Sequence, residues 1–482
     1  MTFPLTFLWT APLVGGLLVL LLAGDGAPRL PRRLALFFAT ALFLYTAAIP
    51  LAAGTFNLTE GGLDLAWGIR YAFALDGLSY ALVLLTAFLT MISLLGSWKE
   101  GHSAGFWASF LFLEAALMGV FLARDLFVFY IFWEASLIPM FFIIGLWGSA
   151  NRRHAAVKFF LYTFGGSLFL LLGALLLVNE RHAMTGLWSW DMSGLRLAGA
   201  GPLSVFIFIS MAIGFAVKIP VFPFHTWLPD AHTEAPAAGS VMLAGVMLKM
   251  GLYGFLRILY PLFPGVGAQL IPWIGGLAAF NAVYGAFGAM AQTDLKRLIA
   301  YSSVAHLGFC LMGIASLTPE GLSGGSLQMI NHGLTTGALF LMVGFVYERS
   351  HRRGLSDFGA LARTAPALGF FFGLACLSSV GVPGLNGFVG EFMSLAGMMR
   401  ALPIAAMAAL IGVALAPAYL LPAFGKVFWD DPGPDSFSSK VTDLDGRERA
   451  ILWTLSGLML IIGFYPRPWL DFFRTAVSQL SL

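Results

Sequence analysis

The sequence of 482 residues is poor in charged residues and in cysteine. Only 11% of its residues are charged, whereas 59% are hydrophobic and the mean hydropathy is +0.85. Soluble domains carry about one quarter charged residues, so a chain of this composition is expected to have a bilayer as its solvent. Cys310 and Cys376 lie far apart in apolar runs, which excludes a disulfide framework and favours small buried side chains.

Motifs for nucleic acid, nucleotides, metals and redox cofactors are also missing. The net charge of +3 is small and forms no basic face, so nucleic acid is not an expected partner. There is no Walker sequence, no GxGxxG and no CxxC. Asp230, His232 and Glu234 alternate on a short segment without further ligands, which is more typical of a solvated loop or helix cap than of a metal site. We therefore expect no cofactor and no metal in this chain.

Long apolar runs dominate what the sequence does contain. Runs long enough to cross the hydrocarbon core recur about fourteen times, which predicts an all-α, multi-pass membrane protein. The first run, residues 4–23, is followed and not preceded by arginines, so we interpret it as a retained span and not as a cleavable signal. With the N-terminus outside, most lysines and arginines fall in the inner loops, which predicts that both termini lie outside.

Proline and glycine interrupt two of the predicted spans. The seventh breaks at Lys218–Pro223 and the twelfth within Ser378–Phe392. Backbone carbonyls freed at membrane depth persist only where protein or a wet cavity satisfies them. Because these spans are an odd number of spans apart, spans 4–8 and 9–13 are predicted to form two inverted five-helix repeats with discontinuous helices 7 and 12, as in transporters. Two proline kinks without functional meaning are the alternative.

This pattern divides the chain into five predicted segments. The longest polar stretch, residues 429–449, is interpreted as a loop or a partner contact. The segments are an N-terminal three-helix segment (1–100), a first repeat (105–259), a second, inverted repeat (269–424), a loop on the cytoplasmic side (425–449), and a C-terminal helix with its tail (450–482).

Ionisable side chains lie inside several of the apolar runs. Charge near the bilayer centre is costly and by default marks a functional site. Ser302 precedes His306 by four residues and Gln328 precedes His332 by four, so polar stripes on helix faces could hold water. The candidates are Glu134, Lys218, Lys249, His306, His332 and Glu391, with Glu114 and His225 as additional ones.

Most of these residues also have a structural explanation. A histidine among Ser and Gln can bridge two helices by hydrogen bonds. Glu114 could pair with an arginine, and Lys218 could neutralise the negative end of a broken helix. Lys249 lies too deep in its run to reach the interface. As a set, however, these groups predict a chain of protonatable stations, in which a Glu134–Lys218 pair that opens and closes changes the proton affinity of the lysine.

Six segments resemble one known family, in order and between about residues 105 and 425. They are YIFWEASLIPM, AVKIPVFPFHTWLPDAHTEAP, LKMGLYGFLRI, TDLKRLIAYSSVAHLGF, MINHGLTTGALFLMVG and VPGLNGFVGEF. They look like the antiporter-like, proton-pumping membrane subunits of respiratory complex I, a family similar to Mrp-type sodium/proton antiporter subunits and membrane-bound hydrogenase subunits. Glu391, where two sibling types carry lysine, favours the M type, the counterpart of mitochondrial subunit four.

The resemblance implies a function, partners and residue roles. Glu134 and Lys218 would be the acid and lysine of the fifth and seventh spans, and Lys249 the central relay. His306 and His332 would continue a hydrated path to Glu391. The chain would translocate protons in the membrane arm of an NADH-quinone oxidoreductase, beside L-type and N-type neighbours, in a bacterial plasma membrane. FMN, iron–sulfur clusters and quinone would be bound in partner subunits, including a peripheral redox arm. An Mrp-type antiporter or hydrogenase subunit, or a passive scaffold, are the alternatives.

Overall fold

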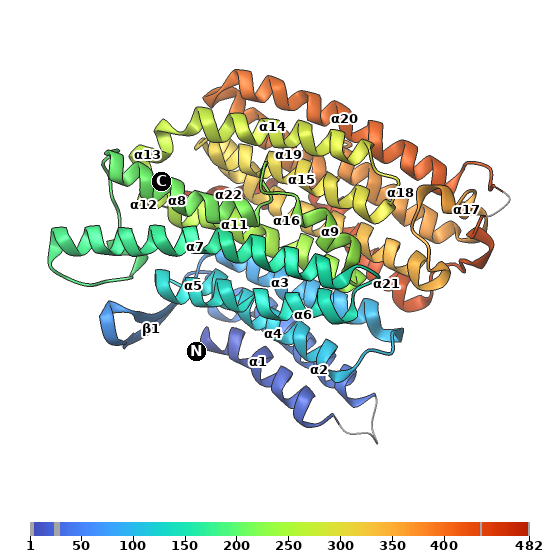
Figure 1. The fold of residues 1–482 in the computed structure, drawn as a ribbon, viewed down its shortest axis with the longest axis horizontal. Helices are drawn as coiled ribbons and strands as arrows, with labels where there is room; N and C mark the ends of the chain where they lie inside the picture. Colours follow the sequence, from blue (N-terminus) through green and yellow to red (C-terminus); the bar gives the residue numbers. More distant parts are fainter. Residues whose placement is uncertain (1–3, 24–28, 434–435, 481–482) are drawn as a thin grey trace. The chain divides into compact units, whose positions relative to one another are not determined.

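The structure, a computed structural model, is almost entirely helical (Figure 1). It describes residues 4–23, 29–433 and 436–480. By its contacts the chain forms two compact units, each with its own packed interior. Unit 1 comprises Met1–Ile219, Val246–Leu270 and Thr475–Leu482, and unit 2 comprises Pro220–Gly245 and Ile271–Arg474. The first boundary lies between Ile219 and Pro220, within the predicted break of the seventh span.

Unit 1 consists of antiparallel helices and one β-hairpin. Its neighbouring helices, such as α1 with α4 and α7 with α8, run side by side (Figure 1). Its elements are α1 (Thr6–Leu21), α2 (Leu30–Ala53), β1 (Leu58–Asp64), β2 (Arg70–Leu75), α3 (Gly77–Gly96), α4 (Ala104–Leu122), α5 (Leu126–Ala135), α6 (Leu137–Trp147), α7 (Arg152–Thr185), α8 (Pro202–Lys218), α11 (Leu248–Gly254), α12 (Tyr260–Leu262) and α13 (Pro264–Gln269).

Unit 2 is built in the same way from packed helices, among which α14 contacts α15 and α20, and α16 contacts α19. The boundaries between the units fall in the π-helical turn Leu243–Met247 and in α22 (Arg467–Ser478). The elements of unit 2 are α9 (Trp227–Glu234), α10 (Ala237–Met242), α14 (Ile271–Met290), α15 (Leu295–Ala315), α16 (Pro319–Ser350), α17 (Leu361–Thr364), α18 (Pro366–Val380), α19 (Asn386–Ala401), α20 (Pro403–Phe428) and α21 (Gly446–Phe464).

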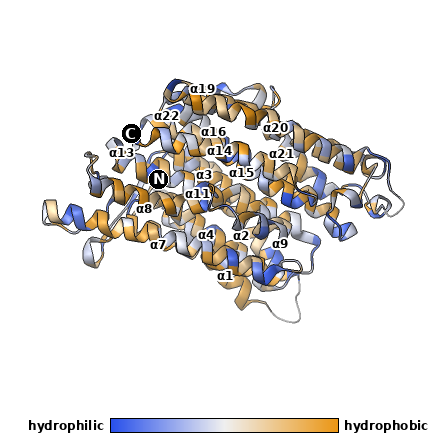
Figure 2. Ribbon diagram, turned by 45° about the horizontal axis from the view of Figure 1, so that its top comes forward, coloured by the Kyte–Doolittle hydropathy of each residue, from blue (hydrophilic) through white to orange (hydrophobic). Residues whose placement is uncertain are grey.

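The helices confirm a multi-pass membrane protein. Ten helices of the described chain are long and apolar enough to cross a membrane, or eleven if the bent pair α21–α22 is one span. α1, α8 and α18 are apolar but shorter, so the number of about fourteen spans stays a prediction. Large apolar side chains are exposed on the outer faces of α7 and α20, including Leu161 and Met407, as expected for contact with lipid. Figure 2 shows the long apolar stretches along these helices.

The β-hairpin is an element that the sequence analysis did not predict. β1 and β2 pair antiparallel, with an irregularity between Gly61 and Leu63. The Glu60 carboxylate accepts hydrogen bonds from the backbone N–H and the hydroxyl of Thr6, which fixes the hairpin to the start of α1. The alternation of Tyr71 and Phe73 with small residues was the available signal, but it is short beside the long apolar runs.

Asp76 joins three segments of unit 1 at the start of α3. Its carboxylate caps the helix by accepting from the Ser79 N–H at 3.0 Å, and it accepts from Arg124 at 2.8 Å and Arg257 at 2.5 Å. Burial by itself raises the pKa of Asp76. The two guanidinium groups and the Ser79 N–H outweigh this effect and hold the pKa at about 2, below its ordinary value of 3.8.

We predict that Asp76→Asn destabilises the fold by about 2 kcal/mol at neutral pH, the equivalent of the pKa shift. A lowered folded-state pKa gives a stabilisation that is complete above the ordinary pKa and disappears as the pH falls toward about 2. The difference in thermal unfolding midpoint between wild type and variant should therefore narrow below about pH 4. A difference that does not change with pH would contradict this assignment.

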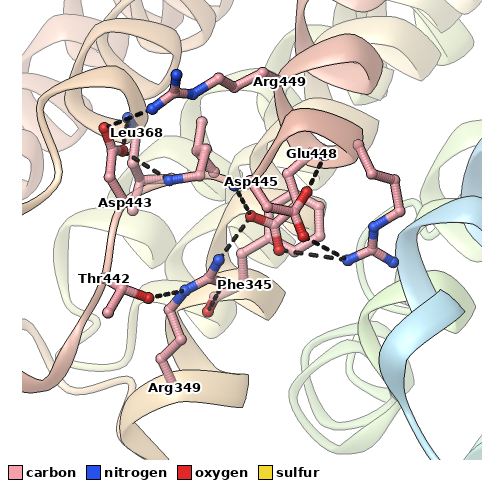
Figure 3. A network of polar contacts seen from close by, with 10 residues as sticks. Phe345, Arg349, Leu368, Thr442, Asp443, Asp445, Glu448 and Arg449 are labelled. Carbon is pink, nitrogen blue, oxygen red and sulfur yellow. Dashed lines mark hydrogen bonds and ion pairs between the residues drawn. The ribbon is translucent and has the colours of Figure 1, made fainter.

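The polar stretch after α20 is fixed to α16 and α18 by a network of carboxylates (Figure 3). Asp443 accepts from the N–H groups of Ala367 and Leu368 at the start of α18. Glu448 is 1% exposed and accepts from Arg349 at 2.6 Å. Asp445 and Glu448 also form a reciprocal capping box at the start of α21. Residues 443–448 of the stretch are therefore packed into unit 2.

Replacing Glu448 by Gln is expected to lower the stability of the assembled protein by about 2 kcal/mol, because it leaves the guanidinium of Arg349 without its buried counter-charge. The thermal unfolding midpoint measures this effect. Glu320→Gln is the matched control, since its partner Arg400 is 69% exposed and such pairs contribute about 1 kcal/mol or less. Equal shifts for both variants would refute the special role of Glu448.

Candidate functional site

Lys218 is the last residue of α8, at the first break. Its side chain is 1% exposed, and the ammonium has no hydrogen-bond partner in the described part of the chain. It lies 5.4 Å from the ring centre of Trp133 and 5.8 Å from that of Phe159. Aromatic faces attract a cation but do not replace its hydrogen bonds with water. The lysine is thus confined in a site that solvates it poorly.

Glu134, near the end of α5, is the acid that the sequence predicted to pair with this lysine. Its half-buried carboxyl group interacts with the hydroxyls of Tyr130 and Ser167 and electrostatically with Lys218. Within the described residues, however, no ion pair of 4 Å or less joins Glu134 and Lys218. The two groups predicted to pair therefore interact electrostatically without direct contact.

Lys249 lies on α11 and is fully buried. The helix around it is interrupted by two π-helical segments, Leu243–Met247 and Phe255–Leu259. Such bulges occur mostly at functional sites, because they realign the side chains of a helix. One turn further, the Tyr253 hydroxyl donates to the Phe121 carbonyl and contacts Ser79. The Tyr253 hydroxyl thus connects α11 with Ser79 and Arg257 of the Asp76 group.

Glu114 is fully buried on α4, and neither carboxylate oxygen has a hydrogen-bond partner among the described residues. A structural ion pair with an arginine, the alternative explanation for this residue, is not seen in that part of the chain. A carboxyl group in such surroundings is costly when ionised. Glu114 thus stays a candidate for proton transfer, without the structural ion pair among the described residues.

The second break separates α18 from α19. Gly381 and Gly384 have φ values of +82° and +94°, which favour glycine, and a Cβ on Gly387 would lie 2.0 Å from the Ser378 carbonyl oxygen. The buried Asn386 side chain holds the break together. Its Oδ1 accepts from the Ser378 hydroxyl at 2.5 Å, and the Asn331 amide donates to the Asn386 carbonyl at 2.7 Å.

His306 and Glu391 meet beside this break. His306 Nδ1 and Glu391 Oε1 are 2.6 Å apart, and His306 Nε2 lies 2.9 Å from the Ser379 hydroxyl. Gln328 donates to the same carboxylate oxygen at 3.2 Å. Both residues are about 5% exposed. A short, buried His–carboxylate contact allows a proton to transfer between the two groups with little movement.

His332 extends this group. Its ring centre lies 5.9 Å from that of His306. Both histidines line a polar cavity of about 10 Å³, together with Thr335, Ser378 and Ser379. That volume corresponds to about one water molecule, and the lining offers several hydrogen-bond partners. Of the two polar neighbours noticed in the sequence, Gln328 therefore lines a space suited to water, whereas Ser302 bonds its own helix.

Other sequence candidates lie elsewhere. His225 is buried in unit 2 with its ring 4.8 Å from that of Tyr284 and 5.8 Å from that of Phe222, and not in the His306 group. Asp230 and Glu234, on α9, face Arg297 and Arg353, and His232 stacks on Phe340. The expectation of a solvated loop or helix cap was therefore wrong in its exposure, because these residues lie on a helix whose His232 and Glu234 are buried.

Three polar residues of unit 2 were not predicted from the sequence. Ser379 and Asn386 belong to no motif or periodic pattern in the sequence, so nothing in it marked them as candidates. Tyr419, on α20, is 3% exposed, and its hydroxyl has no hydrogen-bond partner in the described structure, although it interacts electrostatically with Glu391. A tyrosine in an apolar run is common, so the sequence offered no reason to select Tyr419. Only its position near Glu391 in the folded chain makes it a candidate site residue.

Comparison with known proteins identifies the family. Residues 123–416 match the family model of the NADH:quinone oxidoreductase/Mrp antiporter transmembrane segment. The NADH-quinone oxidoreductase subunit M of Rhodobacter capsulatus is 40% identical over 95% of this chain and 92% of the relative. The chain belongs to the NADH:quinone oxidoreductase/Mrp antiporter family. A family member from Escherichia coli K12, also named subunit M, is 36% identical over 99% of this chain and 97% of its own length.

Solved structures of the family have the same fold. A chain of respiratory complex I from Thermus thermophilus superposes with a TM-score of 0.89 at 33% identity, over 99% of both chains. A chain of the Mrp complex from Dietzia sp. DQ12-45-1b superposes with a TM-score of 0.87 at 22% identity, over 99% of this chain and 97% of that one. The second likeness concerns the fold alone. Chains of two different assemblies therefore share this helical architecture.

Asn386→Ala should destabilise the second break by about 2 kcal/mol, because the buried groups of Ser378 and Asn331 lose their partners. Asn179→Ala, at an exposed position of α7, is the matched control. Limited proteolysis of the purified assembly, followed by mass spectrometry, should show earlier cleavage between α18 and α19 in the Asn386 variant only. Unchanged cleavage would show that the break is held by other contacts.

Proposed function

We propose that this chain is a proton-translocating membrane subunit of a complex I-type NADH-quinone oxidoreductase. It moves protons through buried ionisable groups and water, while partner subunits carry out the redox chemistry. The chain itself binds no redox centre. It works in the bacterial plasma membrane, with both termini on the outer side, beside L-type and N-type antiporter-like subunits. The names of its relatives, their identity and the coverage of both chains support this assignment.

The observation that carries the proposal is the buried ammonium group of Lys218. A lysine retained for structure would be expected to satisfy its charge, since burying an unpaired ion is strongly unfavourable. Here the ammonium has only two aromatic rings, with Glu134 near but not paired. This arrangement suits a lysine that gains and loses its proton. Approach of Glu134 favours the charged form, and separation favours release of the proton toward Lys249.

In unit 2 the proton is carried by the His306–Glu391 pair. His306 can accept a proton on one ring nitrogen while the other stays bonded, because the imidazole has two distinct nitrogens. Ser379 and Gln328 fix the orientation of the pair. The cavity shared with His332 is large enough for about one water, which would continue the path. Glu391 then delivers the proton to the outer side. Glu114 and His225 are further proposed members of the relay.

The rival functions differ in what the charges do. In an Mrp-type sodium/proton antiporter or a hydrogenase subunit, transport would be linked to another ion or another redox reaction. In a scaffold, the charges would only join helices. The unpaired Lys218 and Glu114 argue against a scaffold, since neither side chain joins two helices by a hydrogen bond in the described structure.

Lys218→Gln is expected to leave the complex assembled but to reduce proton pumping at least tenfold, because the amide cannot carry the proton. Pumping is measured by a pH-sensitive dye in sealed vesicles that oxidise NADH. The matched control, Lys426→Gln, removes an exposed lysine of α20 and should pump normally.

The same vesicles separate the rival functions. Pumping that persists unchanged in Lys218→Gln would favour the scaffold. Pumping that requires sodium and is accompanied by sodium movement would favour the antiporter. Assembly is monitored in each case by the presence of the partner subunits in the purified complex, so a folding defect is not mistaken for a transport defect.

A further inference from the structure

A second polar site lies in unit 1, away from the groups assigned to proton transfer. It is a cavity of about 430 Å³ between the β-hairpin, the start of α3, the end of α12 and the C-terminal residues Gln479 and Leu480. Its lining includes Asp76, Arg124 and Arg257 on one side and apolar side chains such as Leu58 and Leu262 on the other. The space is large enough for a small amphipathic group and not only for water.

The charges in this cavity are not balanced. Arg124 and Arg257 both donate to the same oxygen of Asp76, Oδ2. Arg257 also uses Nε to bond Tyr253. Nη1 of Arg257, and Nε and Nη1 of Arg124, have no acceptor among the described residues. Two guanidinium groups against one carboxylate leave one positive charge and several directed donors at the cavity wall.

The position of the group along the helices indicates the kind of ligand. Asp76 directly precedes the apolar span Gly77–Lys99, and Arg124 follows the span Ala104–Leu122. Arg257 lies near the end of the span Ala237–Leu262. Three spans thus end at this cavity, at the depth where the polar and apolar regions of a bilayer meet. The phosphate groups of lipids lie at that depth, and their acyl chains lie deeper.

We propose that this cavity binds a phosphate group through Arg124 and Arg257. Guanidinium groups bind phosphate by charge-assisted N–H···O bonds, and the donors of Arg124 and Arg257 that no described residue uses are available for them. The apolar wall at Leu58 and Leu262 suits the glycerol and upper acyl segment of an anionic phospholipid. Asp76 holds the two arginines in place and neutralises only one of them, so the site keeps one net positive charge. The bound phosphate would link the β-hairpin to the ends of three spans.

The test uses the complete purified assembly and phosphatidylglycerol that carries a photoactivatable group in its headgroup. After illumination, labelled peptides are identified by mass spectrometry. Wild type should be labelled in the peptides that contain Asn57–Thr59 or Met192–Ser193, which line the cavity. Excess phosphatidylglycerol should displace the probe, and phosphatidylcholine should not. If inorganic phosphate alone displaces it, the site binds free phosphate; if it does not, the lipid headgroup is the ligand.

Two variants and one control decide whether the cavity is responsible. Arg124→Gln should reduce labelling at least about fivefold, because one charge-assisted contact is lost. Leu58→Trp should reduce it by filling the apolar side while leaving all three charged groups intact. This second variant keeps the test valid if the arginine variant does not assemble. Arg400→Gln, which removes an exposed arginine of α19, should be labelled like wild type.

The proposal would be overturned by any of three results. These are the absence of labelling in the cavity peptides, labelling that phosphatidylcholine displaces equally well, and labelling that remains unchanged in Leu58→Trp and in an assembled Arg124→Gln. None of these results depends on proton pumping, so the outcome is independent of the proposed function.

Discussion

Burying charge in apolar surroundings is the constraint on which this structure depends. At the ends of helices the constraint is met by pairing: Asp76 accepts from two arginines, and Glu448 accepts from Arg349. Inside the spans it is left unmet at Lys218 and Glu114, whose ionisable groups have no hydrogen-bond partner in the described structure. Because an unpaired buried charge is unfavourable, such groups are expected where a proton is exchanged and not where helices are merely joined.

The broken helices determine where such groups can be placed. A regular helix satisfies its own backbone, whereas a break exposes carbonyl and N–H groups that other side chains must satisfy. At the second break Asn386 and Ser378 do this, and His306, Ser379 and Glu391 lie next to them. Polar side chains needed for the backbone thus also provide a lining for water. The first break places Lys218 at the end of α8, where the chain leaves the helix.

The fold by itself does not specify the ion or the driving reaction. A chain of an Mrp complex has nearly the same architecture at 22% identity, as does the complex I chain from Thermus thermophilus at 33%. Helix packing tolerates many sequences as long as volume and apolar pattern are kept. What separates members of this family is therefore expected to lie in individual side chains, such as Glu391 and the residues that bond to its carboxylate.

The sequence alone determined the membrane fold, the two breaks and the six main candidate residues, because apolar length, proline and a buried charge are each strong local signals. The tertiary structure decided which of these candidate residues are in contact with one another. It brought His306 onto Glu391, residues 85 positions apart, and kept Lys218 unpaired beside Glu134. It also placed His225 among aromatic rings, formed the β-hairpin and assembled the Asp76, Arg124 and Arg257 cavity. Contacts between distant residues leave no periodic trace in a single sequence, so only the packed chain shows them.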